Sequence, residues 1–390
     1  MGGGGFLLNA AGRPAFDDRT LRPAVKKWCE DPEAAKAEFG SAIGKWDVSR
    51  VTNMGGLFAG CEEFNDDISE WDVSNVTSMQ NMFIDASTFN KPLEQWDVSR
   101  VTNMDCMFFG ASAFNQPLNG WADKVSNVTN MRSLFDRTRF EQPLDRWDVS
   151  SVTTMESMFE GSPFNHPLES WDVSSVTSMA RMFYSAESFN QPLNGWAGKV
   201  SSVENMGAMF SSATSFNQPI AQWDVSSVTI MVDMFYTACN FNQPLEQWDV
   251  SSVTDMCNMF REASSFNQPL AQWDVSRVTD MCEMFHSARS FNQPLAQWKL
   301  PSLWNSWGMF RYATSFNQPL TEWNLSRVHR GARMFDGATA FDKSHAPALR
   351  EDQLDGAPCP PVRTRATPPS LSDEDFQRIL SNGQVQRAQQ

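Results

Sequence analysis

Residues 71–95 read WDVSNVTSMQNMFIDASTFNKPLEQ, and close variants of this 25-residue stretch fill most of the chain. Twelve of the 15 tryptophans recur at intervals of 24 to 27 residues and so mark the period. They are Trp46, Trp71, Trp96, Trp121, Trp147, Trp171, Trp196, Trp223, Trp248, Trp273, Trp298 and Trp323. A period of this length is typical of chains in which each repeat buries its apolar face against the next. The sequence therefore predicts a solenoid of about twelve coils.

Each repeat contains two apolar periodicities in succession. Trp96 and Val98 are two residues apart, as on one face of a strand, whereas Val76, Met79 and Met82 have roughly helical spacing. Stacked coils of this kind would form a parallel β-sheet on one face and a row of short helices on the other. The predicted fold class is thus an α/β solenoid.

The two ends of the chain depart from the repeat. Thr20 is suited to cap a helix over 21–29, and Asp31 to cap a second helix that begins at Pro32 and ends at Gly40. We therefore expect four regions: a flexible N-terminus (1–18), a helical N-terminal cap (19–45), the repeat array (46–341) and a disordered tail (342–390) with a short helix at 373–381.

The chain is strongly acidic, with 31 basic and 46 acidic side chains and a formal net charge of −15. An acidic surface repels phosphate backbones, which argues against a nucleic-acid partner. A basic protein or multivalent cations are the better expectation.

Cysteine usage and the termini bear on the cellular compartment. The seven cysteines follow no paired spacing. Cys257 and Cys282 share a repeat position, but we expect adjacent coils to hold their Cα atoms about 9 Å apart, too far for a disulfide. All seven are therefore predicted to be free thiols. The N-terminal sequence is typical of neither a signal peptide nor a myristoylation site, and no apolar run approaches the length of a membrane span.

The pattern LxxWDVSxVTxMxxMFxxAxxFNQPL resembles the BspA-like leucine-rich-repeat surface proteins, in a variant with repeats of about 25 residues and no assigned function. The resemblance covers about residues 20–341. Leu93, Trp96 and Val98 fit the three apolar positions of the leucine-rich-repeat pattern LxxLxL. The resemblance implies a leucine-rich-repeat-like α/β solenoid, display at the cell surface, and adhesion or protein binding. It supplies no catalytic residues.

The residue after each repeat Trp forms a charged column. With the two insertions placed directly after Trp121 and Trp196, the column reads Asp47, Asp72, Asp97, Lys124, Asp148, Asp172, Lys199, Asp224, Asp249, Asp274, Lys299 and Asn324. These side chains flank inward Trp and Val residues, so we expect them on the exposed sheet face. The column either binds cations or a basic partner, or its short Asp side chains bond nearby backbone N–H groups and fix a turn.

Trp304 and Trp307 are the tryptophans that fall at otherwise polar or variable repeat positions. Three residues apart, they would share one helical face. They form either an exposed contact patch or a local repacking of a degenerate coil.

A column of Asn follows the Phe of the FNQPL motif: Asn65, Asn90, Asn115, Asn165, Asn190, Asn217, Asn242, Asn267, Asn292 and Asn317. Such amides can satisfy backbone groups in a stacked ladder, so a structural role is expected.

Catalytic and metal-binding patterns are not found in the sequence. The four histidines fall at unrelated repeat positions, and no glycine-rich phosphate loop follows a strand. We therefore expect neither an enzyme nor a bound cofactor.

The predicted function is a non-catalytic scaffold that binds a protein or a basic ligand through its polar acidic face, with weak Ca²⁺ binding at the Asp column. The alternative is a surface-coat protein that assembles through divalent cations. The sequence alone favours a cytoplasmic location, whereas the family resemblance implies the cell surface.

Overall fold

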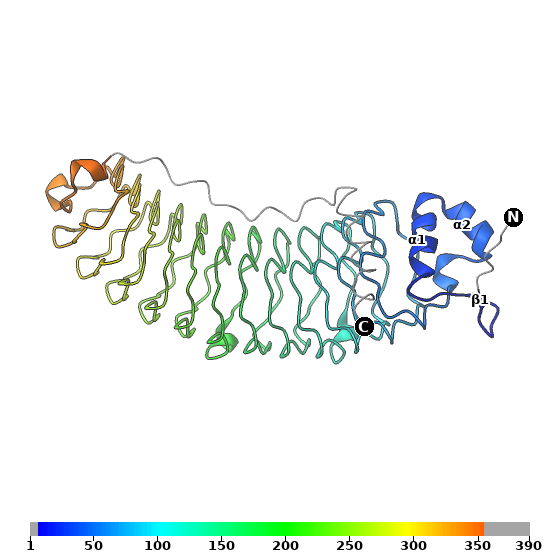
Figure 1. Cartoon of the computed structure of the whole chain (residues 1–390). Helices are drawn as coiled ribbons and strands as arrows, with labels where there is room; N and C mark the ends of the chain where they lie inside the picture. The colour runs from blue at the N-terminus through cyan, green and yellow to red at the C-terminus, as the bar shows by residue number, and fades with distance from the viewer. Residues whose placement is uncertain (1–6, 355–390) are drawn as a thin grey trace, which may run out of the picture. The chain divides into compact units, whose positions relative to one another are not determined.

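The computed structural model describes residues 7–354, which form two compact units. The first unit comprises 7–128 and 133–140, and the second comprises 129–132 and 141–354. Within each unit, consecutive repeats follow one another as stacked loops (Figure 1). The helix predicted at 373–381 lies outside the described residues.

Regular secondary structure is sparse in the described residues. It consists of strands β1 (Leu7–Leu8) and β2 (Pro14–Ala15), helices α1 (Leu21–Glu30) and α2 (Pro32–Phe39), and the 3-10 turns η1 (Ile43–Lys45), η2 (Asn119–Trp121), η3 (Asn194–Trp196), η4 (Lys343–His345) and η5 (Glu351–Gln353).

The predicted α/β solenoid, with a parallel sheet on one face and helices on the other, is therefore wrong. Between residues 7 and 354 the only sheet is the antiparallel pair β1–β2, and no α-helix follows α2. Neighbouring repeats share parallel bridges of a single residue pair, such as Thr154 with Ser178. The segments around Trp96 and Val98 form no strand.

The segment predicted to be helical is a run of tight turns, here called the turn band, from the seventh to the fourteenth residue after the Trp. In the repeat of Trp223, the N–H of Met234 donates to the carbonyl of Met231 (3.3 Å) and closes one turn. The N–H of Asp233 donates instead to the carbonyl of Cys257 in the next repeat (2.9 Å). Alternate N–H groups thus close turns and link repeats, which satisfies the backbone without a helix or a sheet.

Two residues of the turn band, at the tenth and fourteenth positions in the repeat of Trp223, are left-handed without being glycine. Asp233 has φ 57° and Thr237 has φ 55°. A left-handed conformation costs about 1–2 kcal/mol for a residue with a Cβ, and the hydrogen bonds to the next repeat offset that cost. Successive turns place Val76, Met79 and Met82 at three-residue intervals, so a chain of turns imitates helical spacing in the sequence.

The core consists of columns of identical side chains. Phe260 stacks on Phe235 and on Phe285, with ring centroids 5.6 Å apart in both pairs. The buried indole of Trp273 donates from Nε1 to the carbonyl of Leu245 in the preceding repeat (2.9 Å). Each repeat therefore completes the interior of its neighbour, as expected for stacked repeats.

The Asn column forms the expected ladder. The N–H of Asn267 donates to Oδ1 of Asn242 (2.9 Å), and Nε2 of Gln268 donates to the same oxygen (3.0 Å). The pattern recurs between neighbouring repeats of the second unit. The predicted structural role of these amides is confirmed.

The two predicted helices cover the first repeat. Asp31 caps α2 by accepting the N–H of Ala34 (2.9 Å), and Gly40 ends this helix with φ 73°. Thr20 precedes α1 but makes no capping bond, because its hydroxyl pairs with Asp17 instead. The hairpin β1–β2 also joins this end, although the sequence did not predict it.

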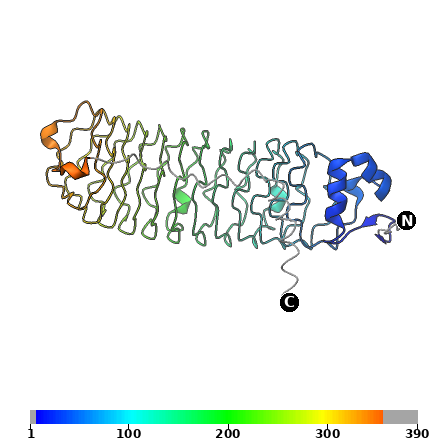
Figure 2. The ribbon, with the colours of Figure 1, turned by 45° about the horizontal axis from the view of Figure 1, so that its top comes forward.

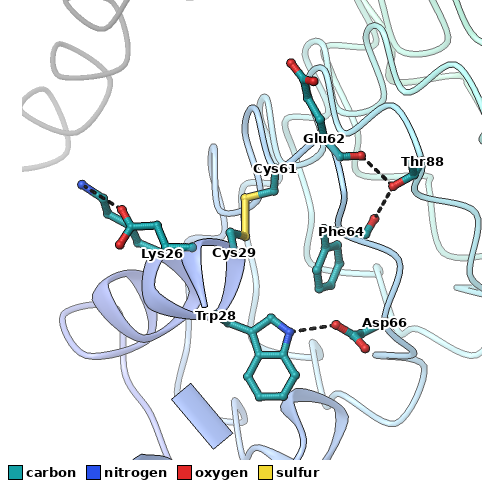
Figure 3. Close-up of a disulfide and its surroundings, with 9 residues drawn as sticks. Lys26, Trp28, Cys29, Cys61, Glu62, Phe64, Asp66 and Thr88 are labelled. Atoms are coloured by element: carbon teal, nitrogen blue, oxygen red, sulfur yellow. Dashed lines mark hydrogen bonds and ion pairs between the residues drawn. A yellow bond between two sulfur atoms is a disulfide. The ribbon is translucent and has the colours of Figure 1, made fainter. Parts of the chain in front are cut away.

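A disulfide between Cys29 and Cys61 ties α1 to the first repeat (Figure 3). Beside it, Nε1 of Trp28 donates to Asp66 (2.8 Å). Cys282 is also disulfide-bonded, so the prediction of seven free thiols is wrong. That prediction considered distances between equivalent repeat positions, whereas Cys29 lies on a helix outside the repeat and its Cα is 5.7 Å from that of Cys61.

Each two-residue insertion directly follows a 3-10 turn, η2 or η3, drawn in Figure 2 as short cyan and green helical pieces. Each turn begins with Asn-Gly. A Cβ on Gly120 would lie 2.3 Å from the carbonyl oxygen of Glu94, and one on Gly195 would lie 2.2 Å from that of Glu169. Glycine is required here because the turn passes directly over the preceding repeat.

Candidate binding surfaces

The Asp column forms a regular polar row in each unit, which we call the Asp–Ser row. It comprises Asp47, Asp72 and Asp97 in the first unit and Asp148, Asp172, Asp224, Asp249 and Asp274 in the second. In every case Oδ1 accepts the N–H of the Ser two residues later, at 3.0–3.1 Å. All except Asp47 are exposed. The row thus fixes a turn, as one interpretation predicted, and leaves carboxylates at the surface without any sheet beneath them.

At Asp172 and Asp274 these hydrogen bonds favour the ionised carboxylate. The pKa of Asp172 is lowered mainly by the hydroxyl and the N–H of Ser174, with a smaller contribution from Lys199. Ser276 lowers the pKa of Asp274 in the same way. Such residues stay negatively charged at neutral pH.

The lysines of the predicted column make different contacts. Lys124 donates from Nζ to the carbonyl of Trp96 (3.2 Å), and Lys199 donates to that of Trp171 (3.1 Å). Both are half-buried, whereas Lys299 is exposed. Two of the three lysines therefore bond the backbone of the preceding repeat.

Trp304 and Trp307 do not share a face, because the segment forms no helix. Trp304 is 43% exposed and lies 4.9 Å from the guanidinium of Arg330. Trp307 is buried and packs against Cys282 and Ala332. The structure thus leaves Trp304 as the exposed ring and favours local repacking for Trp307.

The turn band of the second unit carries ion pairs that the sequence did not reveal. Arg181 binds Glu160 with two hydrogen bonds, from Nε (2.8 Å) and from Nη2 (2.5 Å). Arg261 donates from Nη1 to Glu283 of the next repeat, and its Nε donates to the neighbouring Glu262 (3.5 Å). Both pairs join the thirteenth residue after one Trp to the tenth residue after the next Trp. In the sequence, these ion pairs are marked by residues of opposite charge that are 21 or 22 positions apart.

Arginines in this band also lie against tyrosines. The guanidinium carbons of Arg181, Arg261 and Arg311 are 3.9, 5.6 and 4.8 Å from the ring centroids of Tyr184, Tyr236 and Tyr312, the three tyrosines of the chain. Tyr, Trp and Arg are the residues enriched at the energetic centres of protein interfaces. The band therefore combines fixed backbone with the side chains used in recognition.

Comparison with known families gives one match. The family described as "Mycoplasma protein of unknown function, DUF285" matches residues 31–136, 122–200, 197–255 and 240–347. The chain belongs to this family. No curated protein matches the chain. Four overlapping matches identify a repeat-containing protein, and the family description assigns no activity or partner.

Buried carboxylates accompany the ion pairs of the turn band. Burial raises the pKa of Asp233 to about 6, against the opposing effects of Asn258 and Arg261. Burial likewise raises the pKa of Asp255 to about 6. Perturbed groups of this kind often mark functional sites, although structural networks produce them as well.

Among residues 7–354, one group of three has ligand atoms close enough to hold a metal ion. Cys257, Asp280 and Cys282 bring these atoms within 4.8 Å of one another. Cys282 is disulfide-bonded, however, and a metal ligand must be a thiolate. This group therefore does not form a metal site in the present structure.

Within residues 7–354, no helix is both long enough and apolar enough to cross a bilayer.

Proposed function

We propose that this protein is a non-catalytic repeat scaffold that binds a basic protein partner through the Asp–Ser row. The observation that carries the proposal is the row itself: a series of exposed, ionised carboxylates, each held in one orientation by a following Ser. Fixed side chains lose little conformational freedom when they bind, so preorganisation favours affinity. The net charge of −15 would also attract a basic partner at long range.

The exposed carboxylates of the row retain an oxygen for a partner, unlike Asp47, whose Oδ2 accepts from Asn9. Asp172 uses Oδ1 for the N–H of Ser174, and among the described residues its Oδ2 accepts no hydrogen bond. A lysine or arginine of a partner can therefore bind Oδ2 without opening the turn.

We further propose that the protein acts at the cell surface. The resemblance of the repeat to BspA-like surface proteins supports this location. The Cys29–Cys61 disulfide supports it independently, because disulfides form and persist in oxidising environments.

The proposal is tested by binding of a labelled oligolysine peptide, measured by fluorescence anisotropy. The test variant combines Asp148→Asn, Asp172→Asn, Asp224→Asn and Asp249→Asn, which removes charge but keeps an oxygen for each turn. The matched control removes the same charge elsewhere in the second unit, with Glu169→Gln, Glu187→Gln, Glu246→Gln and Glu322→Gln.

We expect the Asp variant to weaken binding at least tenfold and the Glu variant to weaken it by about threefold or less, with the difference shrinking as salt is raised. Equal losses in the two variants would show that net charge, rather than the row, attracts the peptide. That result would reject the row as the binding surface.

The second candidate is assembly of copies through Ca²⁺, which the unbonded carboxylate oxygens favour. It predicts that sedimentation grows with protein concentration when Ca²⁺ is added and that the Asp variant abolishes this growth. A binding scaffold predicts a constant sedimentation coefficient with and without Ca²⁺.

A further inference from the structure

Two ion pairs of the second unit, Glu160–Arg181 and Arg261–Glu283, follow a positional rule. Glu160 and Arg261 each occupy the thirteenth position after a Trp, and each pairs with the tenth-position residue of the next repeat, Arg181 or Glu283. The turn band therefore brings these two positions together across a repeat boundary, and in both cases it joins a carboxylate to a guanidinium.

The same rule places two cations together near the last repeats. Arg311 occupies the thirteenth position after Trp298, and Arg333 the tenth position after Trp323. Arg333 approaches Asp336 of its own repeat (3.9 Å). Within residues 7–354, Arg311 forms no ion pair, and its Nε is buried without a hydrogen-bond partner. Its Nη2 donates to the hydroxyl of Tyr312 (3.3 Å).

The comparison with Arg181 shows which chemical group suits Arg311. In Arg181, Nε and Nη2 together hold the two carboxylate oxygens of Glu160. In Arg311 the same edge of the guanidinium meets a single phenol oxygen. Arg181 occupies the tenth position, whereas Arg311 shares the thirteenth position with Arg261, which also pairs with a carboxylate, that of Glu283. Guanidinium groups at both positions of the band thus bind carboxylates, and Arg181 does so with side-on, two-bond geometry.

Neighbouring groups add further unused donors. The indole of Trp307, 5.8 Å from the guanidinium carbon of Arg311, is 5% exposed and its Nε1 has no partner. His286 is 7% exposed, its Nδ1 has no partner, and its ring meets that of Tyr312 edge-on at 5.5 Å. Tyr312 is 45% exposed. Arg311 is half-buried and lies beside this exposed ring, so its side chain is near the surface, with the unpartnered donors beneath it.

We propose that Arg311, Arg333 and the indole of Trp307 bind the carboxylate of an acidic side chain of a partner protein. A single carboxylate within a neutral or basic segment is the favoured ligand, because the net charge of −15 repels polyanions at long range. The site uses repeat positions other than those of the Asp–Ser row and does not depend on the function proposed for that row.

The test follows the indole N–H resonances of the full chain by NMR. The probe is N-acetyl-glutamate α-amide, and N-acetyl-glutamine α-amide is its neutral counterpart. The Trp307 resonance is assigned by its loss in Trp307→Phe. We expect the glutamate probe to shift this resonance saturably, with a Kd on the order of millimolar, and the glutamine probe to leave it in place.

Variants then assign the contact. Arg311→Gln should weaken binding at least tenfold, and Arg311→Lys, which keeps the charge but lacks Nε, should weaken it severalfold. Arg289→Gln removes an exposed charge from the preceding repeat and should have no effect. The Asp–Ser row variant should bind the glutamate probe as the unmodified chain does, so that failure of either proposal is visible separately.

Three results would overturn the proposal: no saturable shift with the glutamate probe, an equal shift with the glutamine probe, or unchanged binding in Arg311→Gln with a normal unfolding curve. Saturable binding of inorganic phosphate together with no response to the glutamate probe would also reject a carboxylate as the ligand.

Discussion

The turn bands of the two units use the same backbone for opposite chemistry. In the first unit, the thirteenth positions of the first three repeats hold Ala59, Ile84 and Phe109, which pack with Cys106 into one buried cluster. In the second unit, the equivalent positions hold the pairs Glu160–Arg181 and Arg261–Glu283. Both bands nevertheless contain left-handed turns and hydrogen bonds to the next repeat. The backbone and the aromatic core therefore specify the repeat, while the side chains of the band are free to vary.

The charged version of the band brings no evident gain in stability. Burial raises the pKa of Glu283 and outweighs the lowering effects of Arg261 and Arg311. Its ionised form is thus less favourable in the folded protein than in water, in spite of its partner. Replacing buried ion pairs by apolar residues is often neutral or stabilising.

The largest effect is expected when a charge enters the apolar band. Ile84 is 3% exposed. Ile84→Arg should lower the free energy of unfolding by about 3–5 kcal/mol, because a buried guanidinium would lack a partner. Adding Cys106→Glu should recover part of this loss, because the new carboxylate could pair with the introduced guanidinium as Glu283 pairs with Arg261. Urea denaturation of both variants measures the recovery. No recovery in the double variant would show that the two bands are not equivalent.

Breaking an existing pair is expected to cost somewhat less. Glu283→Ala leaves the half-buried Arg261 with the more exposed Glu262 (3.5 Å) in place of its buried partner and should destabilise the second unit by about 1–3 kcal/mol. The double variant Arg261→Ile with Glu283→Ala copies the apolar band and should lie within about 1 kcal/mol of the unmodified protein. If the double variant loses the sum of both single effects, the pair is a structural requirement and the comparison of the two bands fails.

The difference between the two turn bands should also depend on pH, because Asp233 in the second unit has a raised pKa. Its equivalent in the first unit, ten residues after Trp71, is Asn81. With a folded pKa of about 6, above the reference value of 3.8, the folded state binds the proton more tightly, so this group lowers stability as pH rises from about 4 to 6. Asp233→Asn should therefore stabilise by about 1–3 kcal/mol at pH 8 and lose this advantage near pH 4.

Urea denaturation at several pH values measures this difference. His286, with a pKa lowered to about 4 by burial and by Arg261 and Arg311, acts in the opposite direction, so that stability falls as its ring must be protonated. The quantity to compare is consequently the difference between Asp233→Asn and the unmodified protein. A difference that does not vary between pH 4 and pH 8 would contradict the raised pKa.

The smallest effect belongs to the exposed Asp–Ser row. Asp172→Ala removes the oxygen that accepts the N–H of Ser174 and should cost about 0.5–1 kcal/mol. Asp172→Asn keeps the oxygen and should be nearly neutral. Thermal unfolding of both variants separates the contribution of the hydrogen bond from that of the negative charge. An equal loss in both would mean that charge, rather than the hydrogen bond, fixes the turn.

The sequence sufficed to predict the features that depend on composition at each repeat position. The period, the buried Trp and Phe columns, the Asn ladder and the helices α1 and α2 all follow from residue type and spacing. The turn role of Asp172 could also be predicted, because Asp favours a bond to a backbone N–H two residues later.

Backbone conformation and contacts between repeats could not be predicted in this way. Left-handed turns usually signal themselves by glycine, but Asp233 and Thr237 adopt this conformation with full side chains. Apolar residues three apart fit such turns as well as they fit a helix. The Cys29–Cys61 disulfide and the Glu160–Arg181 pair depend on the path between elements, which periodicity does not determine.

The most direct test of the central claim, that left-handed turns build the repeat, is the stability of Thr237→Gly. Thr237 has φ 55° and is half-buried, and its N–H donates to the carbonyl of Arg261 (2.8 Å). Glycine adopts this φ without steric cost, so the variant should be more stable by about 0.5–1 kcal/mol in urea denaturation. In the helix that the sequence suggested, the same substitution would destabilise by up to about 1 kcal/mol. A loss of stability in Thr237→Gly would contradict the account.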